Sequence, residues 1–460
     1  MKLDIINIKN FKTYIPIGIF GAYLLAFIII YKCLESPSVY DKYFAKIMPN
    51  YENINGNREQ VTKPFISISS KALEETNDAA SYFQIKNDYY NYRADDEFAK
   101  YNFGFFPLFP IVWKITHLSG KGILVFNFFL FAISILILAS VFCPKSMVTA
   151  SLVVLALPTL TVYFVPYSES VFLFCISIAI LGWKRKWTSI FLLGLFLASC
   201  TRPVFLLLIG SFIATEIFFF IRNKNRHFEA KKILLPVAAI LTGTLCVALF
   251  QKTFHHSSLL TFIEAQKHWG TFLQIPKTIV DWSNEGYAMN IWAMFFAFIF
   301  GFSILIKELI KKSASKEVSF NWWYYFSWIY IIAASVFVVI LQGGCFHSLY
   351  RYTLCTPFFY IIVFQHLNEN KKLNLLQPLL LTALSIFSSI YFIANGGYGN
   401  NWNFTKVGFV LLSFNLIFFI VLPRLNLISK SIGFGLLSLG GIIWNCYLLN
   451  MFVSQAWIFL

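Results

Sequence analysis

The sequence predicts an all-α protein that crosses a membrane many times. Of its 460 residues, 58% are hydrophobic and only 13% are charged, whereas a soluble domain has about 25% charged residues. Apolar runs recur from Ile15 to the C-terminus, and many approach the ~20 residues that an α-helix needs to span a bilayer. We therefore expect a polytopic membrane protein with about 11 to 13 transmembrane helices and large extracytoplasmic loops.

The first apolar run covers residues 15–31 and follows three lysines. No small-residue cleavage pattern appears before Lys32, although a cleaved signal peptide would need one. We expect residues 1–34 to form a cytoplasmic N-terminus and a retained first transmembrane helix. A signal peptide is the alternative.

The basic residues lie in small clusters between apolar runs. If the N-terminus is cytoplasmic, successive breaks between apolar runs face the inside and the outside in turn. The basic clusters then fall on the inside, and the breaks on the outside have few positive charges. This is the pattern of the positive-inside rule, so the net charge of +16 is interpreted as a topology signal and nucleic-acid binding is not expected. The inside clusters are residues 184–186, 222–232, 307–316, 371–372 and 424–430.

Two long polar segments between the apolar runs divide the rest of the chain into loops and membrane regions. Residues 35–118 form a first extracytoplasmic loop, and residues 251–290 form a second. Transmembrane helices occupy residues 119–250 and 291–460. Long loops of this kind are usually functional, which places the chemistry outside the cytoplasm. Neither a nucleotide-binding P-loop nor a Gly-rich dinucleotide fingerprint is present in the sequence.

The first loop holds a candidate catalytic acid, Asp78. Tyr82, Phe83, Tyr89 and Tyr90 follow it at spacings that predict a short interfacial helix with Asp78 on one face. The alternative is an acid in a solvated loop. After this segment, FFPLFP at residues 105–110 predicts an aromatic, proline-stiffened return to the membrane.

Two outer turns between apolar runs contain further charged residues. Tyr167 and Glu169 lie in the stretch VPYSES, where the carboxylate either faces a polar cleft or snorkels at the turn. Arg202 lies in the next outer turn, just before Pro203. An Arg between apolar helices needs an anionic partner, which either Glu169 or a ligand phosphate would supply.

A later outer segment, GGCFHSLYRYTLCTPFF, contains His347, Arg351 and Tyr352. The positive-inside rule disfavours an Arg at this end of a helix, so Arg351 is interpreted either as a phosphate ligand or as the partner of an external acid. In the second loop, Gln266, His268, Trp269 and their neighbours form EAQKHWG, a composition suited to binding sugar hydroxyls and stacking on a sugar ring.

In this order, the motifs resemble those of the PIG-V-type mannosyltransferases of the GT-C membrane glycosyltransferase superfamily. The resemblance spans residues 76–359, and YSES and FFPLFP are its most specific parts. The chain departs from the family pattern at Asn77, Leu157 and Tyr89, where Trp, Asn and Gly are usual. The matching stretches are Asp78-Ala79 with Phe83, Ile85 and Tyr90, then FFPLFP, Pro158 with YSES, TRP at residues 201–203, AQKHWG and RYTLCTPFF.

The resemblance implies a GT-C fold and transfer of a hexose, with mannose expected, from a polyprenyl-phosphate donor with inversion. It implies Asp78 as general base, with Glu169 as a second catalytic carboxylate or as the partner of Arg202. Donor phosphate binding is assigned to Arg202, Arg351 and His347. Contacts to the sugar or acceptor are assigned to Tyr167, Gln266, His268, Trp269 and Tyr352. The spacing of His and carboxylate residues predicts no metal site, and no cofactor is assigned. Binding of a divalent cation between an acid and the donor phosphate stays an open alternative.

The composition, rich in Asn, Lys, Ile and Phe, is typical of an AT-rich bacterium. We therefore expect an inner-membrane enzyme with a periplasmic active site, a polyprenyl-phosphate sugar donor and a glycolipid, glycan or protein acceptor among the membrane lipids. A transporter or flippase for a lipid-linked sugar is the alternative. A non-catalytic accessory subunit is a third candidate.

Overall fold

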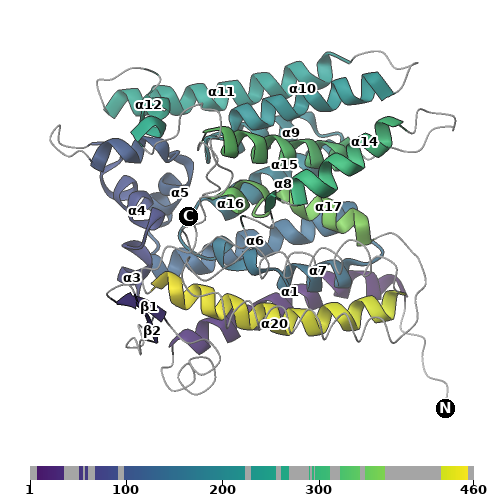
Figure 1. Ribbon diagram of the computed structural model, residues 1–460, viewed down its shortest axis with the longest axis horizontal. Helices are drawn as coiled ribbons and strands as arrows, with labels where there is room; N and C mark the ends of the chain where they lie inside the picture. Colours follow the sequence, from purple (N-terminus) through teal and green to yellow (C-terminus); the bar gives the residue numbers. More distant parts are fainter. Residues whose placement is uncertain are drawn as a thin grey trace.

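The computed structural model shows long helices lying side by side, with a group of short elements gathered at one end (Figure 1). The elements α3 and α4 and a small β-hairpin lie together at the left of that view. The structure describes residues 8–35, 51–54, 57–60, 68–91, 98–222, 229–254, 259, 261–268, 290, 293–294, 296–310, 322–341, 348–367 and 426–453.

The elements are grouped here as helices of the bundle and as elements of the loops and connections. The helices of the bundle are α1 (Ile8–Glu35), α6 (Gly120–Phe142), α7 (Met147–Leu155), α8 (Glu169–Arg185), α9 (Thr188–Ser199), α10 (Phe205–Arg222), α11 (Lys231–Phe254), α14 (Phe302–Ile310), α15 (Trp322–Leu341), α17 (Pro357–Leu367) and α20 (Leu427–Val453). The elements of the loops and connections are β1 (Tyr51–Ile54), β2 (Asn57–Gln60), α3 (Ser70–Glu74), α4 (Asp78–Asp88), the 3₁₀-helices η2 (Phe98–Gly104) and η3 (Pro158–Tyr163), α5 (Leu108–Thr116), α12 (Thr261–His268), the π-helix η4 (Phe296–Gly301) and α16 (Leu349–Thr353).

The prediction of an all-α polytopic membrane protein is confirmed. Within the described residues, five helices are long and apolar enough to cross a membrane, and α9 and α17 are shorter apolar helices. The first span, Ile15–Lys32, lies within α1. On α11, the exposed side chains include Leu234, Leu241 and Leu245, which is the surface that lipid would cover. The five spans are Ile15–Lys32, Gly120–Phe142, Phe205–Arg222, Lys231–Phe254 and Trp322–Leu341.

Close helix packing depends on glycines at the contacts. A Cβ atom at Gly194 of α9 would lie 2.7 Å from the backbone oxygen of Cys175 in α8. A Cβ atom at Gly441 of α20 would lie even closer to the backbone oxygen of Leu155, the last residue of α7, and 2.7 Å from Cα of Ala156. Small residues at such contacts let two backbones approach in a membrane, where dispersion contacts hold helices together. The contact at Gly194 packs α9 closely against α8, whose first residue is Glu169.

The first loop folds onto the end of the bundle. The backbone N–H of Gly120, at the start of α6, donates to Glu74 Oε1 at 2.6 Å. The side chain of Gln251 in α11 donates to the carbonyl of Phe103 at 2.9 Å. Phe106 and Phe109, from the FFPLFP stretch, are fully buried. The short elements of this loop therefore pack on the bundle as part of one folded structure.

The helix predicted around Asp78 exists, but it is shorter than its aromatic pattern indicated. α4 begins at Asp78 and ends at Asp88, so Tyr89 and Tyr90 lie beyond it. Tyr89 has a positive φ of 54°, a conformation that breaks the helix and in which Gly is the least strained residue. The Tyr89 ring stacks on Phe254 of α11, and the Tyr90 ring stacks on Phe103 of the same loop.

Candidate functional site

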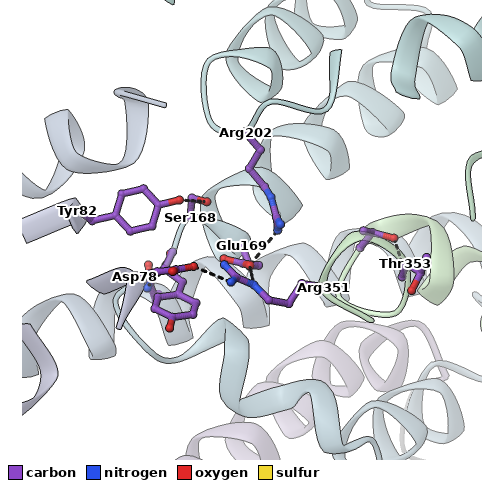
Figure 2. Close-up of polar contacts among 10 residues, drawn as sticks. Asp78, Tyr82, Ser168, Glu169, Arg202, Arg351 and Thr353 are labelled. Carbon is purple, nitrogen blue, oxygen red and sulfur yellow. Dashed lines mark hydrogen bonds and ion pairs between the residues drawn. The ribbon is translucent and has the colours of Figure 1, made fainter. Parts of the chain in front are cut away.

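Four charged side chains from four separate segments meet in one cluster (Figure 2). Arg351 donates from Nη1 to Asp78 Oδ2 at 2.6 Å and from Nε to Glu169 Oε1 at 2.8 Å. Arg202 Nη1 lies 3.0 Å from the same Glu169 oxygen. Glu169 therefore joins the two arginines, and Arg351 joins the two carboxylates.

Both carboxylates are held at the beginning of a helix. Asp78 is the first residue of α4, and Glu169 is the first residue of α8. The first turn of a helix has unpaired N–H groups and the positive end of the helix dipole, so a negative charge is favoured there. Asn77, just before Asp78, has a φ of 48°, which turns the chain sharply into α4.

The two arginines lie in short connections between helices. Arg202 belongs to the turn between α9 and α10. Arg351 belongs to α16, a single short helix that starts after Ser348, whose φ is 58°. The backbone N–H of Tyr350, the residue before Arg351, donates to Asn290 Oδ1 at 3.0 Å. This bond fixes α16 against a segment 60 residues earlier in the chain.

The four charges are nearly inaccessible to solvent and balance one another. The exposed fractions are 0% for Glu169, 5% for Arg202, 7% for Arg351 and 8% for Asp78. Buried charges are tolerated only when they are paired and hydrogen-bonded. Burial lowers the pKa of Arg351, but the attraction of Glu169 and Asp78 outweighs it, so this pKa is raised well above its ordinary value.

Tyrosines line the charged cluster. The Arg351 guanidinium carbon lies 4.7 Å from the ring centre of Tyr167, and that of Arg202 lies 5.0 Å from the ring centre of Tyr352. Both distances suit a cation–π contact. Beside them, Tyr82 of α4 donates to Ser168 Oγ at 2.8 Å. Burial and then the negative charge of Glu169 raise the pKa of Tyr82, so the phenol keeps its proton and acts as a donor.

Two atoms of the cluster are buried without a hydrogen bond to any described residue. They are Glu169 Oε2 and Arg202 Nη1, the latter being close to Glu169 Oε1 as an ion pair only. Buried polar atoms in native proteins nearly always have a partner, so an exception indicates a water or a ligand. The cluster thus has donor and acceptor capacity left for a polar ligand beside Arg202 and Glu169.

Six of the ten site residues expected from the sequence lie in or against this cluster. They are Asp78, Tyr167, Glu169, Arg202, Arg351 and Tyr352. His347 and Trp269 lie outside the described residues. Gln266 and His268 belong to α12, but their side chains are not among those described.

The structure decides between several alternatives for these residues. Asp78 is a buried, paired acid and not a solvated loop acid, and Glu169 is fully buried and does not snorkel to the surface. The partner of Arg202 is Glu169, and Arg351 pairs with both acids. Sequence reasoning missed the Tyr82–Ser168 contact. The spacing of Tyr82 four residues after Asp78 was its only signal.

No group of three or more His, Cys, Asp or Glu side chains suited to a metal ion occurs within the part of the chain that the structure describes. Comparison of the chain with protein-family models, curated proteins and solved structures found no match. What the site can do therefore follows from its own chemistry. It offers a carboxylate for accepting a proton and two guanidinium groups for binding an anion, all in surroundings from which water is largely excluded.

Proposed function

We propose that this chain is an integral-membrane glycosyltransferase that moves a hexose, with mannose expected, from a polyprenyl-phosphate sugar to an acceptor hydroxyl. One observation supports this most strongly. Two carboxylates and two arginines from distant segments form one buried cluster where the first loop meets the helix bundle. A transfer of this kind needs a base for the acceptor and cations for the departing phosphate, and the cluster offers both.

In the proposed reaction, the acceptor oxygen attacks the anomeric carbon and forms the new glycosidic C–O bond with inversion. The bond between the anomeric carbon and the phosphate oxygen breaks, and its electron pair leaves with the lipid phosphate. The acceptor proton passes to Asp78. A positioned general base contributes roughly 10²- to 10⁴-fold to such a rate. Arg202 and Arg351 stabilise the negative charge that grows on the phosphate.

Asp78 suits the role of base better than Glu169 does. Glu169 is fully buried and pairs with both arginines, so removing its charge would leave two cations with one partner. Asp78 is slightly exposed and pairs with Arg351 alone among the described ion pairs. It also begins α4, which belongs to the loop and not to a membrane span. Glu169 is therefore assigned as a positioning residue that orients the two guanidinium groups.

The resemblance to PIG-V-type mannosyltransferases supports the same assignment, because its motifs supply the residues of the cluster. The distribution of basic residues supports an extracytoplasmic site. The composition supports a bacterial inner membrane with the site facing the periplasm. Acceptors at that face include glycolipids, glycans and exported proteins, each of which presents hydroxyl groups.

The experiment that tests this function measures transfer of radiolabelled sugar in membranes that contain the wild type or Asp78→Asn. The donors are polyprenyl-phosphate mannose and its glucose counterpart. Asp88→Asn is the matched control, since it makes the same change at the exposed end of the same helix. We expect transfer by the wild type and the control, and loss of transfer in Asp78→Asn at equal protein level.

Other outcomes lead to different conclusions. Equal transfer by all three proteins would exclude Asp78 as base and leave Glu169 as the remaining carboxylate of the cluster. If no protein transfers sugar but vesicles containing the wild type move a lipid-linked sugar across the bilayer, the protein is a flippase. If neither activity appears, the glycosyltransferase assignment is rejected.

A further inference from the structure

Arg351 is already engaged by the protein itself in this structure. Its Nε and Nη1 groups donate to Glu169 and Asp78 at 2.8 and 2.6 Å, and its guanidinium lies over the Tyr167 ring. With Arg202 included, the cluster contains two cations and two carboxylates. An arriving phosphate therefore meets a balanced cluster: beside Arg202 it can use the remaining donor capacity, but at Nη1 of Arg351 it has to replace the carboxylate of Asp78.

The same contact limits Asp78. Asp78 Oδ2 accepts a charge-assisted hydrogen bond of 2.6 Å from Arg351 Nη1, so the guanidinium occupies this oxygen. Opening the pair without a replacement anion would leave a buried cation with one partner fewer. While the Arg351–Asp78 pair is intact, Nη1 of Arg351 and Oδ2 of Asp78 are engaged with each other.

We propose that the Arg351–Asp78 ion pair is a latch that the donor opens: the lipid phosphate takes the place of Asp78 on Arg351, and this releases Asp78 to act as the base. This inference rests on the proposed function and adds an order to it. The donor binds first, the carboxylate becomes available second, and the acceptor is deprotonated only after both. Acceptor hydroxyls and water meet no free base until a donor is bound.

The two carboxylates differ in how readily they can leave Arg351. Glu169 begins a helix that packs against α6 and α9 within the bundle, and both arginines hold it. Asp78 begins α4, an 11-residue helix of the loop, and its side chain is 10% exposed. Displacement of Asp78 moves only the first turn of a peripheral helix. Displacement of Glu169 would disturb both arginines at once.

The remainder of α4 has contacts that can hold it while its first turn moves. Tyr82 is bonded to Ser168, and the Tyr82 ring packs edge-on against Phe105 and Phe109 at 5.0 Å. These contacts lie one turn after Asp78 and do not involve Arg351. The released carboxylate therefore stays close to the phosphate and to the carbon under attack.

Hydrogen exchange of α4 tests the latch. The full-length protein in nanodiscs is compared with and without polyprenyl phosphate lacking a sugar, and bound radiolabelled lipid is measured in the same samples. In the wild type and in the control Asp88→Asn, we expect the lipid to speed exchange of the first-turn amides of α4 severalfold. In Asp78→Asn, exchange should be fast without lipid and unchanged by it.

The outcomes separate the latch from the proposed function. If the lipid binds and α4 exchange stays the same or slows in the wild type, the latch is rejected, even where sugar transfer is observed. If exchange speeds up as expected but no sugar is transferred from either donor, the latch is supported and the glycosyltransferase assignment fails. If the wild type does not bind polyprenyl phosphate, both are rejected. The wild-type result decides the matter even where Asp78→Asn fails to fold.

Discussion

Arg351 and Asp78 are 273 residues apart in the chain, yet a hydrogen bond of 2.6 Å joins their side chains. The bond connects α16, between two helices of the bundle, with the first turn of α4 in the first loop. It ties the loop to the bundle at the point where the remaining charges of the site converge. This relationship makes the loop a part of the site.

Removal of the charge at Glu169 should destabilise the protein as well as abolish transfer. Glu169→Gln leaves two buried arginines with one carboxylate, and breaking a buried ion pair in this way costs about 3–5 kcal/mol. Thermal unfolding in detergent checks this expectation. The control Glu75→Gln removes one partner of a surface pair whose N–O distance is 4.0 Å, for which about 0–1 kcal/mol is expected. Equal stability of the two variants would contradict the structural role of Glu169.

Arg202 should affect the rate of transfer more through its shape than through its charge. In the proposed reaction, Arg202→Gln removes a preorganised donor to the leaving phosphate, a change that typically lowers kcat by about 10²- to 10³-fold. Arg202→Lys keeps the charge but lacks the planar fork and the stack on Tyr352, so we expect it to recover only part of this loss. Arg185→Gln, at an exposed position on α8, is the matched control. Full activity of Arg202→Gln would remove Arg202 from the mechanism.

The Tyr82–Ser168 hydrogen bond should be measurable as a coupling between α4 and the start of α8. Each of Tyr82→Phe and Ser168→Ala removes one partner of a buried bond of 2.8 Å, for which about 0.5–1.5 kcal/mol is typical. The double variant should lose less than the sum of the two single losses. Chemical denaturation of the wild type, the two single variants and the double variant completes this double-mutant cycle. Simple additivity would mean that the bond contributes nothing in the membrane protein.

Asn445 of α20 should be needed for stability although it lies outside the charged cluster. Its Oδ1 accepts from Thr161 N and Oγ1 at 2.9 and 2.8 Å, and its Nδ2 donates to the carbonyls of Leu157 and Gly441 at 3.1 and 2.7 Å. Asn445→Leu removes all four of these hydrogen bonds, each typically worth about 0.5–1.5 kcal/mol, although Thr161 Oγ1 can still donate to the backbone carbonyl of residue 445.

Thermal unfolding of Asn445→Leu beside the wild type and Asn87→Ala measures this loss. Asn87 is exposed on α4, so its variant should unfold like the wild type. An unchanged unfolding temperature for Asn445→Leu would show that water or neighbouring side chains replace the amide. Phe452 of the same helix packs on Tyr167 at 5.7 Å, so a stable but inactive variant would show that α20 also positions the site.

The predictions from sequence were most accurate where local chemistry decides structure. Hydropathy alone indicated the long spans such as Gly120–Phe142, because any backbone that crosses a bilayer must satisfy its hydrogen bonds within a helix. A short helix that includes Asp78 also followed from local pattern. Its end did not, since the positive φ at Tyr89 occurs where the Tyr89 ring contacts Phe250 and Phe254 of α11, which are distant in the sequence.

The sequence by itself determined that the protein is a helical membrane protein, and it singled out Asp78, Glu169, Arg202 and Arg351 because a charge beside apolar runs requires a reason. The tertiary structure decided how these charges pair. Pairing depends on which helix ends lie next to one another, and that follows from packing between segments far apart in the chain. Ion pairs are short-ranged and directional, so only the folded arrangement could show that Arg351 binds both acids and that Glu169 binds both arginines.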